Sequence, residues 1–267
     1  MITDIFKLYH NAWISRIPPH KSSIITKRDA EDLLHKGGQI VRNVYNWDSK
    51  DTTSFWYVIK DEYGGIEELT SKVRNQVKKS CKVYEFKLVD IKEMTENGFE
   101  LYNYSRAKFK DKSLLLTKEQ WNSRLKGDEK QLWLGYHRET GIPQVFAINR
   151  VFDDHCDYVS MGVNPDAPSS TYPMYGLILE MNRFYLAEKN LLYVSDGARS
   201  ITEHSNIQPF LIDKFKFRKA YCDIQVFYSF WMGLVIRTLF PLRKWIKNKK
   251  IAALLNQEAM ARNICKE

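Results

Sequence analysis

The amino-acid sequence predicts an α/β fold in which helices flank a mixed, largely antiparallel sheet, with an amphipathic appendage at the C-terminus. Segments with the periodicities of strands and helices alternate along the chain, and three strand candidates follow one another in its middle. No internal repeat and no linker rich in Pro, Gly and Ser interrupts this order. We therefore expect one domain over residues 1–225, whose first 50 residues show little pattern, and a distinct segment over residues 226–267.

The composition is that of a folded protein in a reducing compartment. Of the 267 residues, 44% are hydrophobic and 13% aromatic, with 12 Gly and 8 Pro, which excludes disordered and collagen-like classes. The four cysteines are far apart and form no CxxC pair, so neither a zinc site nor a disulfide framework is expected. Charged residues interrupt the apolar ones in the first 16 positions, so no signal peptide is expected either.

The net charge of +9 comes from one part of the chain. Between Lys214 and Lys250 there are ten basic residues and a single acidic one, Asp223, so the rest of the chain is neutral overall. A local excess of this kind indicates a basic surface near the C-terminus.

The first half of the chain gives local signals for helices and strands. Thr26 is a suitable N-cap for a short helix over 27–35, and Thr117 and Gln120 form a capping box for another. Apolar residues spaced by three and four from Ile66 to Cys81 predict an amphipathic helix. The expected elements are strands at 55–59 and 82–89 and helices at 27–35, 66–81, 95–109 and 117–126.

In the second half, the three consecutive strand candidates are joined by turn signals, which predicts an antiparallel meander. Pro173 and the preceding Ser and Thr residues supply the start of a helix. The expected elements are strands at 131–136, 144–152, 156–163, 191–194 and 217–228 and helices at 175–188 and 207–215.

Three motifs between Leu132 and Tyr228, about a third of the chain, resemble a known family. They are Gly162-Val163-Asn164-Pro165 after a strand, Tyr193-Val194-Ser195-Asp196-Gly197, and the Phe-Lys-Phe-Arg sequence within 210–221. This stretch resembles the Gcn5-related N-acetyltransferase fold, which is acyl-CoA N-acyltransferase-like. It is most similar to the Fem-like branch, which makes the interpeptide bridges of peptidoglycan.

The resemblance implies that two neighbouring strands diverge near Val163 and that the acyl donor lies between them, its carbonyl held by strand amides. Val163 and Gly176 would then contact the donor. The usual phosphate-binding loop, Arg/Gln-x-x-Gly-x-Gly/Ala, is reduced here to Gly176 within 169–176, with no basic residue. This departure counts against acyl-CoA as the cofactor, whereas aminoacyl-tRNA, the donor in Fem-like enzymes, stays compatible.

The densest polar cluster follows the predicted strand at 191–194, a common place for a site in α/β sheets. Asp196 or His204 can deprotonate an attacking amine, and Arg199 can hold a phosphate or carboxylate. Ser200 and Asn206 are further candidates for substrate binding. The alternative interpretation is a turn with an internal Asp196–Arg199 pair and a helix cap at Ser205.

Hydroxyl and basic side chains complete the candidate site. Tyr175 can protonate a leaving group, and Tyr158 and Ser160 can bind substrate. Lys216 alternates with aromatic residues among other basic side chains and can contact substrate phosphate or tRNA; a solvated edge strand is the alternative. The histidines outside the polar cluster have no partner at useful spacing, and no metal ligands are expected.

Residues 226–240 contain a single charge, Arg237, and are followed by a basic stretch. They are too short to span a bilayer, which needs about 20 apolar residues. A helix kinked at Pro241 and continuing through Trp245 would place apolar and aromatic residues on one side, as interfacial helices do on anionic membranes. The alternative is a helix packed on the body of the protein or in a dimer interface.

These observations predict a cytoplasmic acyl- or aminoacyl-transferase at the inner membrane face. Its partners would be an acyl donor and an amine of a sugar, a lipid-linked saccharide or a cell-wall precursor, with nucleic acid involved only if tRNA is the donor. The alternative is a non-catalytic protein of the same fold that docks on the membrane or on a biosynthetic complex. Nucleic-acid binding in general has no motif here and would depend on charge alone.

Overall fold

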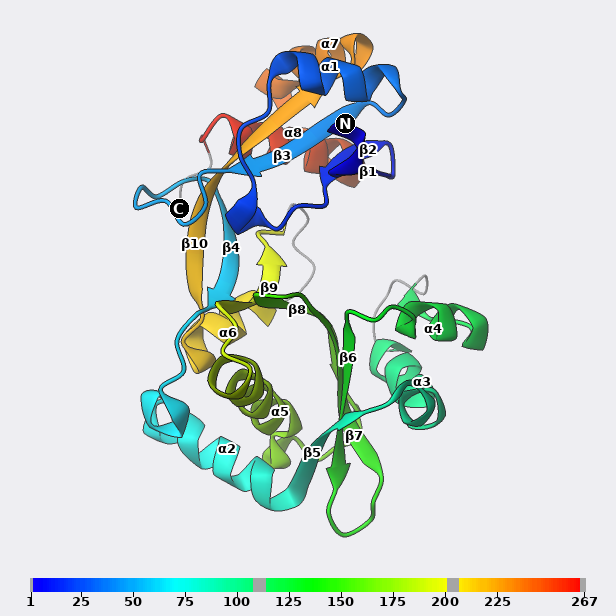
Figure 1. Ribbon diagram of the computed structural model, residues 1–267, viewed down its shortest axis with the longest axis vertical. Helices are drawn as coiled ribbons and strands as arrows, with labels where there is room; N and C mark the ends of the chain where they lie inside the picture. Colours follow the sequence, from blue (N-terminus) through cyan, green and yellow to red (C-terminus); the bar gives the residue numbers. More distant parts are fainter. Residues whose placement is uncertain (1, 108–113, 201–206, 265–267) are drawn as a thin grey trace. The chain divides into compact units, whose positions relative to one another are not determined.

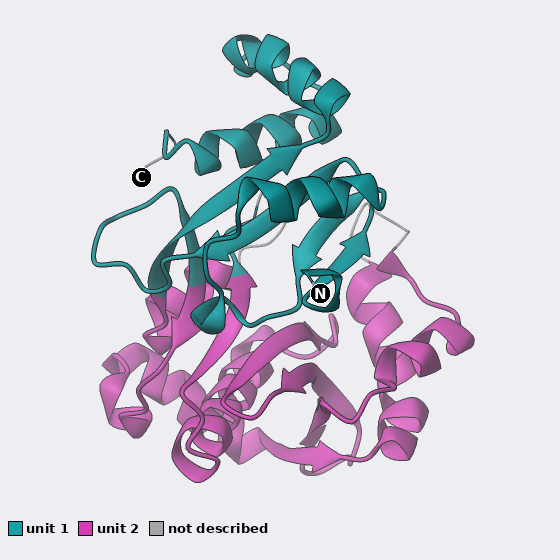
Figure 2. Ribbon diagram, turned by 45° about the horizontal axis from the view of Figure 1, so that its top comes forward, with its two compact units in different colours: residues 1–57, 198–205, 219–267 teal, residues 58–197, 206–218 magenta. Residues whose placement is uncertain are grey.

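The computed structural model describes residues 2–107, 114–200 and 207–264 (Figure 1). The chain forms two compact units, coloured separately in Figure 2. Unit 1 comprises residues 1–57, 198–205 and 219–267, and unit 2 comprises residues 58–197 and 206–218. Both units are therefore built from segments that are distant in the sequence.

Unit 2 contains the meander that the sequence predicts. Its strands lie in the order β9-β8-β7-β6-β5, in which β5 to β8 pair antiparallel and β9 runs parallel to β8. The strands are β5 (Tyr84–Val89), β6 (Lys130–His137), β7 (Pro143–Val151), β8 (His155–Val163) and β9 (Tyr193–Ala198).

Helices cover both faces of this sheet (Figure 1). On one face lie α3 (Ile91–Ala107) and α4 (Lys118–Leu125), and on the other lie α2 (Ser71–Val83) and α5 (Pro173–Asn182). Alternate residues of β6 divide between the faces: Leu132 and Leu134 pack in a cluster with Trp121 of α4, whereas Trp133 contacts Tyr185. This alternation is the period of two expected of a sheet buried on both sides.

Two helices of unit 2 differ from the prediction at their ends. The helix expected from Ile66 begins at Ser71, because Gly65 has a φ of +71°, residues Gly65–Glu68 form a 3-10 turn, and the Thr70 side chain caps the following helix. The helix expected over 175–188 is α5 followed by a π-helical turn at Arg183–Glu188. The capping box of Thr117 and Gln120 is confirmed at α4, and α6 spans Ile207–Phe215 as predicted.

Unit 1 contains three strands that the sequence analysis missed in the first 50 residues. They are β1 (Phe6–Tyr9), β2 (Ala12–Ser15) and β3 (Ile40–Tyr45), joined in the order β1-β2-β3-β10-β4 by β10 (Arg218–Tyr228) and β4 (Phe55–Lys60). His10 and Asn11, both with positive φ, form the two-residue turn of the β1–β2 hairpin. Helix α1 (Lys27–His35) has the predicted N-cap Thr26 and packs over this sheet through Leu33.

The C-terminal part of unit 1 is helical, but the predicted helix does not continue through Pro241. Helix α7 (Phe230–Leu239) ends before a 3-10 turn at Phe240–Leu242, and α8 (Lys249–Ala261) begins after the cap Asn248. Pro241 lacks the N–H that a continuing helix needs, so the chain turns there. None of the helices in the described parts of the chain is long and apolar enough to cross a bilayer.

Candidate functional site

In unit 2, strands β8 and β9 pair over a short stretch and then separate. The recorded pairs run from His155 with Tyr193 to Asp157 with Ser195 and include no later residue of the described strands. We call the point of separation the β8/β9 fork. Strand β8 also carries a bulge there, because Ile148 and Asn149 of β7 pair with Ser160 and Tyr158 and leave Val159 as an extra residue. The resemblance to acetyltransferases implies a divergence near Val163, whereas the last pair of these two strands is at Asp157, earlier in β8.

Asp196 lies on β9 immediately past the last paired residue. Gly197 follows it with a φ of +89°, and the Gly197 N–H donates to Ser195 Oγ at 2.9 Å, so the strand bends directly after Asp196. Burial raises the pKa of the Asp196 carboxyl to about 7, and a hydrogen bond with Gln208 of α6 opposes this shift. A carboxyl with this pKa can take up or release a proton near neutral pH.

Tyr158 provides a buried phenol on the β8 side of the fork. Its hydroxyl donates to Asn182 Oδ1 at 2.8 Å, and its ring lies 6.3 Å from the ring of Phe217. Burial raises the pKa of Tyr158 well above its ordinary value, and the nearby acidic groups of Cys156, Tyr185 and Asp196 raise it further. The phenol therefore keeps its proton and can act as a hydrogen-bond donor.

A network of buried polar groups surrounds this phenol. The Tyr185 hydroxyl accepts hydrogen bonds from Trp133 Nε1 at 2.9 Å and from Asn149 Nδ2 at 3.2 Å. Tyr185 belongs to the π-helical turn, a local distortion that is frequent at functional sites. The sequence analysis did not assign this network. The available signal is that Asn149 and Asn182 are polar residues within an otherwise apolar strand and helix.

Arg106 of α3 is a second feature that the sequence analysis missed. Its guanidinium donates to Ser160 Oγ at 3.1 Å and to the Met161 carbonyl at 3.0 Å. The predicted site residue Ser160 is thus buried beside a cation, at the bulge of β8.

Tyr175 and Gly176 lie in the first half of α5, after a residue with positive φ, Tyr172. The Tyr175 ring contacts the ring of Phe210 at 5.2 Å, and burial raises the pKa of its phenol. A Cβ on Gly176 would overlap the Phe86 ring and lie 2.5 Å from Ser80 Oγ, so glycine permits α5 to pack closely on β5 and α2. Val163, the other residue assigned to donor binding, pairs with Val145 at the end of β8.

The basic residues near 216 do not share one face, as a strand would require. Lys214 lies in α6, Lys216 is exposed in the following turn with a φ of +60°, and β10 starts only at Arg218. Arg218 Nε donates to both carboxylate oxygens of Asp61 at 3.1 Å. These residues would share one face only in a strand, and they are spread because the helix continues to Phe215, as predicted.

The remaining predicted residues divide between unit 1 and the undescribed part of the chain. In unit 1, Arg199 donates to the Ser54 carbonyl at 2.8 Å and its guanidinium lies 4.1 Å from the centre of the Trp56 ring. Ser200 is exposed. His204 and Asn206, together with Ser205, lie outside the described residues, so their assignments remain predictions.

Comparison with known proteins gives similarity of structure but not of sequence. No protein-family model and no curated protein sequence match the chain. Among solved structures, a C-terminal domain from Agrobacterium fabrum, assigned to lysylphosphatidylglycerol synthetase, superposes with a TM-score of 0.54 at 13% identity, covering 88% of this chain and 84% of that one.

Two further structures give similar values. FemX has a TM-score of 0.52 at 10% identity, and the match covers 70% of this chain and 64% of that one. The structure of L-PGS from Bacillus licheniformis has a TM-score of 0.52 at 11% identity, covering 87% and 83%. The fold of this chain is therefore shared with FemX and with the lysylphosphatidylglycerol synthetase domain, which confirms the fold predicted from the resemblance.

Proposed function

We propose that this protein is an acyltransferase that transfers an aminoacyl or other acyl group to a lipid or cell-wall acceptor at a membrane surface. The observation that carries the proposal is the half-buried Asp196, with a pKa of about 7, at the β8/β9 fork. In this position its carboxylate removes the proton from the attacking amine or hydroxyl of the acceptor.

The other groups of the fork fit the remaining steps. Unpaired amides of β8 beyond the fork can donate to the oxyanion that forms when the nucleophile adds to the donor carbonyl. When the leaving group departs with the bond electrons it needs a proton, which the phenol of Tyr158 or Tyr175 can supply because both have raised pKa values. The tyrosine phenolate that remains takes up a proton from solvent, and Asp196 releases the proton it accepted, so both groups return to their starting states.

The structural neighbours support an aminoacyl donor and an envelope acceptor. Lysylphosphatidylglycerol synthetase, by its name, joins lysine to a phospholipid, and two neighbours carry this name or its abbreviation. The absence of any basic residue from 169–176 also favours aminoacyl-tRNA over acyl-CoA as the donor. The acceptor expected from the sequence is an amine of a sugar, a lipid-linked saccharide or a cell-wall precursor. With these neighbours, we extend the proposal to include a lipid hydroxyl.

An exposed apolar surface on the C-terminal helices supports action at a membrane. We define the α7 patch as the exposed side chains of Phe230, Trp231, Leu234, Val235, Leu242 and Trp245. Trp231 is 72% and Trp245 79% exposed, which the packed-helix alternative does not explain. Exposed lysines at 244, 247, 249 and 250 flank and follow Trp245, the last residue of the patch. Apolar and basic side chains together are typical of interfacial helices on anionic lipid.

A transfer assay tests the proposal. Purified protein is incubated with tRNA charged with a mixture of ¹⁴C-labelled amino acids, or with ¹⁴C-acetyl-CoA. The acceptors are phosphatidylglycerol liposomes and a soluble cell-wall precursor bearing a free amine. We expect label from charged tRNA to appear in an acceptor, and Asp196→Asn to abolish the transfer. Asp213→Asn, which changes an exposed carboxyl of the same unit, should retain it.

The same assay decides on the non-catalytic alternative. The reduced loop at 169–176 is the observation that favours a docking protein without activity. If the folded wild-type protein floats with anionic liposomes yet transfers no label from either donor, the catalytic proposal is wrong and the docking function stands.

A further inference from the structure

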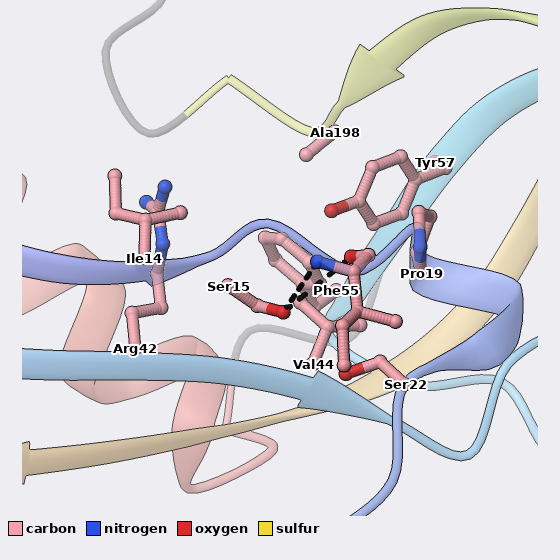
Figure 3. A pocket seen from close by; sticks show the side chains of 10 residues that line it. Ile14, Ser15, Pro19, Ser22, Arg42, Val44, Phe55, Tyr57 and Ala198 are labelled. Carbon is pink, nitrogen blue, oxygen red and sulfur yellow. Dashed lines mark hydrogen bonds between the residues drawn. The ribbon is translucent and has the colours of Figure 1, made fainter. Parts of the chain in front are cut away.

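Unit 1 contains a pocket of its own, built on the face of the sheet formed by β2, β3 and β4. Its volume is about 60 Å³, and apolar residues such as Ile14, Val44 and Phe55 make up much of its lining. Since one water takes about 30 Å³ of liquid volume, the pocket has room for two waters or for one small ionic group. Figure 3 shows Ile14 and Arg42 on one side of the view and Tyr57 with Ala198 on the other.

Arg42 is the charged side chain of this lining. It comes from the middle of β3, between the buried residues Val41 and Asn43, and it is partly buried. Within the described part of the chain, no hydrogen bond or ion pair of the Arg42 guanidinium is recorded. Burial lowers the pKa of Arg42 from its ordinary value, and the neighbouring Tyr57 opposes this only in part.

Several other arginines of the chain do have acceptors. Arg106 donates to Ser160 and to a carbonyl, Arg199 to the Ser54 carbonyl, and Arg218 to Asp61. A guanidinium carries five N–H donors and stays charged, so even partial burial without a protein acceptor costs free energy. No Arg42 nitrogen is among the fully buried unpartnered atoms of the described residues, so solvent in the pocket still reaches this group. The Arg42 guanidinium is therefore a charged donor group with no acceptor among the described residues, which is suited to binding an anion.

The two serine hydroxyls of the lining have partners elsewhere in the protein. Ser15 Oγ accepts from the Ile17 N–H at 3.0 Å, and Ser22 Oγ donates to Asn43 Oδ1 at 3.2 Å. Both side chains are thus fixed in place by the protein and form part of the pocket wall.

We propose that the pocket of unit 1 binds a phosphate group through the Arg42 guanidinium. The planar fork of arginine matches the oxygens of an oxyanion through two parallel hydrogen bonds, and the pocket has room for one such group. The choice of phosphate over carboxylate rests on the proposed function, because phospholipid, nucleotide-linked and tRNA substrates all carry phosphate. Two sources remain for this group: free phosphate, or the headgroup of a lipid.

Thermal shift measurements at constant ionic strength test this binding without any turnover. We expect inorganic phosphate to raise the melting temperature of the full-length protein saturably, relative to chloride. Arg42→Gln should weaken the affinity at least tenfold, whereas Arg28→Gln, an exposed arginine of the same unit, should leave it unchanged. Without phosphate, Arg42→Gln should melt no lower than the wild type, because it removes an unpaired cation.

Titration with glycerol phosphate distinguishes the two sources. Tenfold tighter binding than that of inorganic phosphate assigns the pocket to a lipid headgroup, and equal binding assigns it to free phosphate. A wild type that shows no saturable shift with either compound, or an Arg42→Gln variant with unchanged affinity, overturns the proposal.

A second measurement on the wild-type protein covers the case in which Arg42→Gln does not fold. Phosphate should protect Arg42, but not Arg28, from modification by phenylglyoxal, as mapped by mass spectrometry of peptides. Equal modification of Arg42 with and without phosphate would contradict the proposed site. Because neither measurement needs acyl transfer, phosphate binding can be established even if the transfer assay gives no product.

Discussion

Asp196 changes its charge within the physiological pH range, since burial sets the pKa of its carboxyl at about 7. If Asp196 is the base, only its ionised form is active, so the initial rate of transfer should rise with pH through about 7 and then level off. Asp196→Asn should lower the rate by about 10²- to 10⁴-fold and remove this rise. Rates measured from pH 5.5 to 8.5 check the expectation, and a wild-type rate independent of pH over this range would contradict it.

The same shift makes folding stability depend on pH. The ordinary pKa of aspartate is 3.8, so between that value and about 7 the folded protein holds a proton that the unfolded chain has lost. The free energy of unfolding therefore falls as pH rises through this window. Asp196→Asn removes this pH dependence. The melting temperature of the variant should therefore rise relative to that of the wild type from pH 4 to pH 7.

Asp213→Asn is the control for this stability effect. Asp213 is exposed, and its hydrogen bond and charge interaction with Lys214 lower the pKa of its carboxyl. A lowered pKa contributes stability that is complete above the unfolded value of 3.8 and is lost only as pH falls below it, so the melting temperature of this variant should keep a nearly constant difference from the wild type between about pH 5 and pH 7. A rise relative to the wild type as large as that of Asp196→Asn over this range would refute the assignment for Asp196.

At the scale of elements, α7 presents one buried and one exposed side, and substitutions on the two sides should act differently. Phe230→Ser with Trp231→Ser removes two exposed rings, so the free energy of unfolding should change by no more than about 0.5 kcal/mol. Recovery with anionic liposomes in flotation should nevertheless fall. Ile236→Ala, on the buried side, should cost about 2–5 kcal/mol of stability.

This comparison separates membrane binding from ordinary packing. If the double variant melts far below the wild type with no lipid present, the α7 patch belongs to the core of the protein. If it floats as well as the wild type, another surface binds the lipid.

Helix α5 depends on glycine for its close approach to β5 and α2. Gly176→Ala should lower the free energy of unfolding by about 1–3 kcal/mol, because the new methyl group overlaps the Phe86 ring and Ser80. Gly233→Ala in α7 is the matched control, since its methyl group would meet Tyr228 Cβ at an ordinary 3.6 Å. Urea unfolding of both variants measures the difference, and equal stabilities would refute the packing argument.

The sequence predicted those elements whose signals are local. The capping residues Thr26 and Thr117 and the turns of the meander lie next to the elements they define, and all are confirmed. Strand β3 was missed: it lies between β2 and β10, its partner β10 is far away in the sequence, and Asn43 and Gln225 meet only in the folded chain. The break at Pro241 was expected as a kink, since sequence alone does not show whether packing continues a helix beyond proline.

The candidate site shows the same limit. Asp196 was predicted because it follows an apolar strand directly, a pattern visible within a few residues. Three residues of the site were not predicted, because each acts through a neighbour that only folding brings close. They are Gln208 beside Asp196, Asn182 beside Tyr158 and Arg106 beside Ser160. The assignments of His204 and Asn206 lie in the part of the chain without described structure and stay predictions.

At the scale of the whole molecule, unit 2 occupies a nearly continuous stretch of sequence. Residues 58–218 include every segment of unit 2, with only 198–205 belonging to unit 1. We expect this fragment to fold alone, because it contains the helices on both faces of its sheet. Circular dichroism and a cooperative thermal transition check this, and a fragment without such a transition would contradict it. The fragment 1–57 is the control and should remain unfolded.

The pairing of β3 with β10 also fixes an order of events during translation. Asn43 contacts Gln225, which is 182 residues later in the chain. At 5–20 residues per second the ribosome needs about 10–40 s to make the intervening segment. During that time the apolar side chains of β1, α1 and β3 lack the neighbouring strand β10. The N-terminal residues, although synthesised first, are thus among the last to reach their final packing, and the nascent chain presents them to chaperones in the meantime.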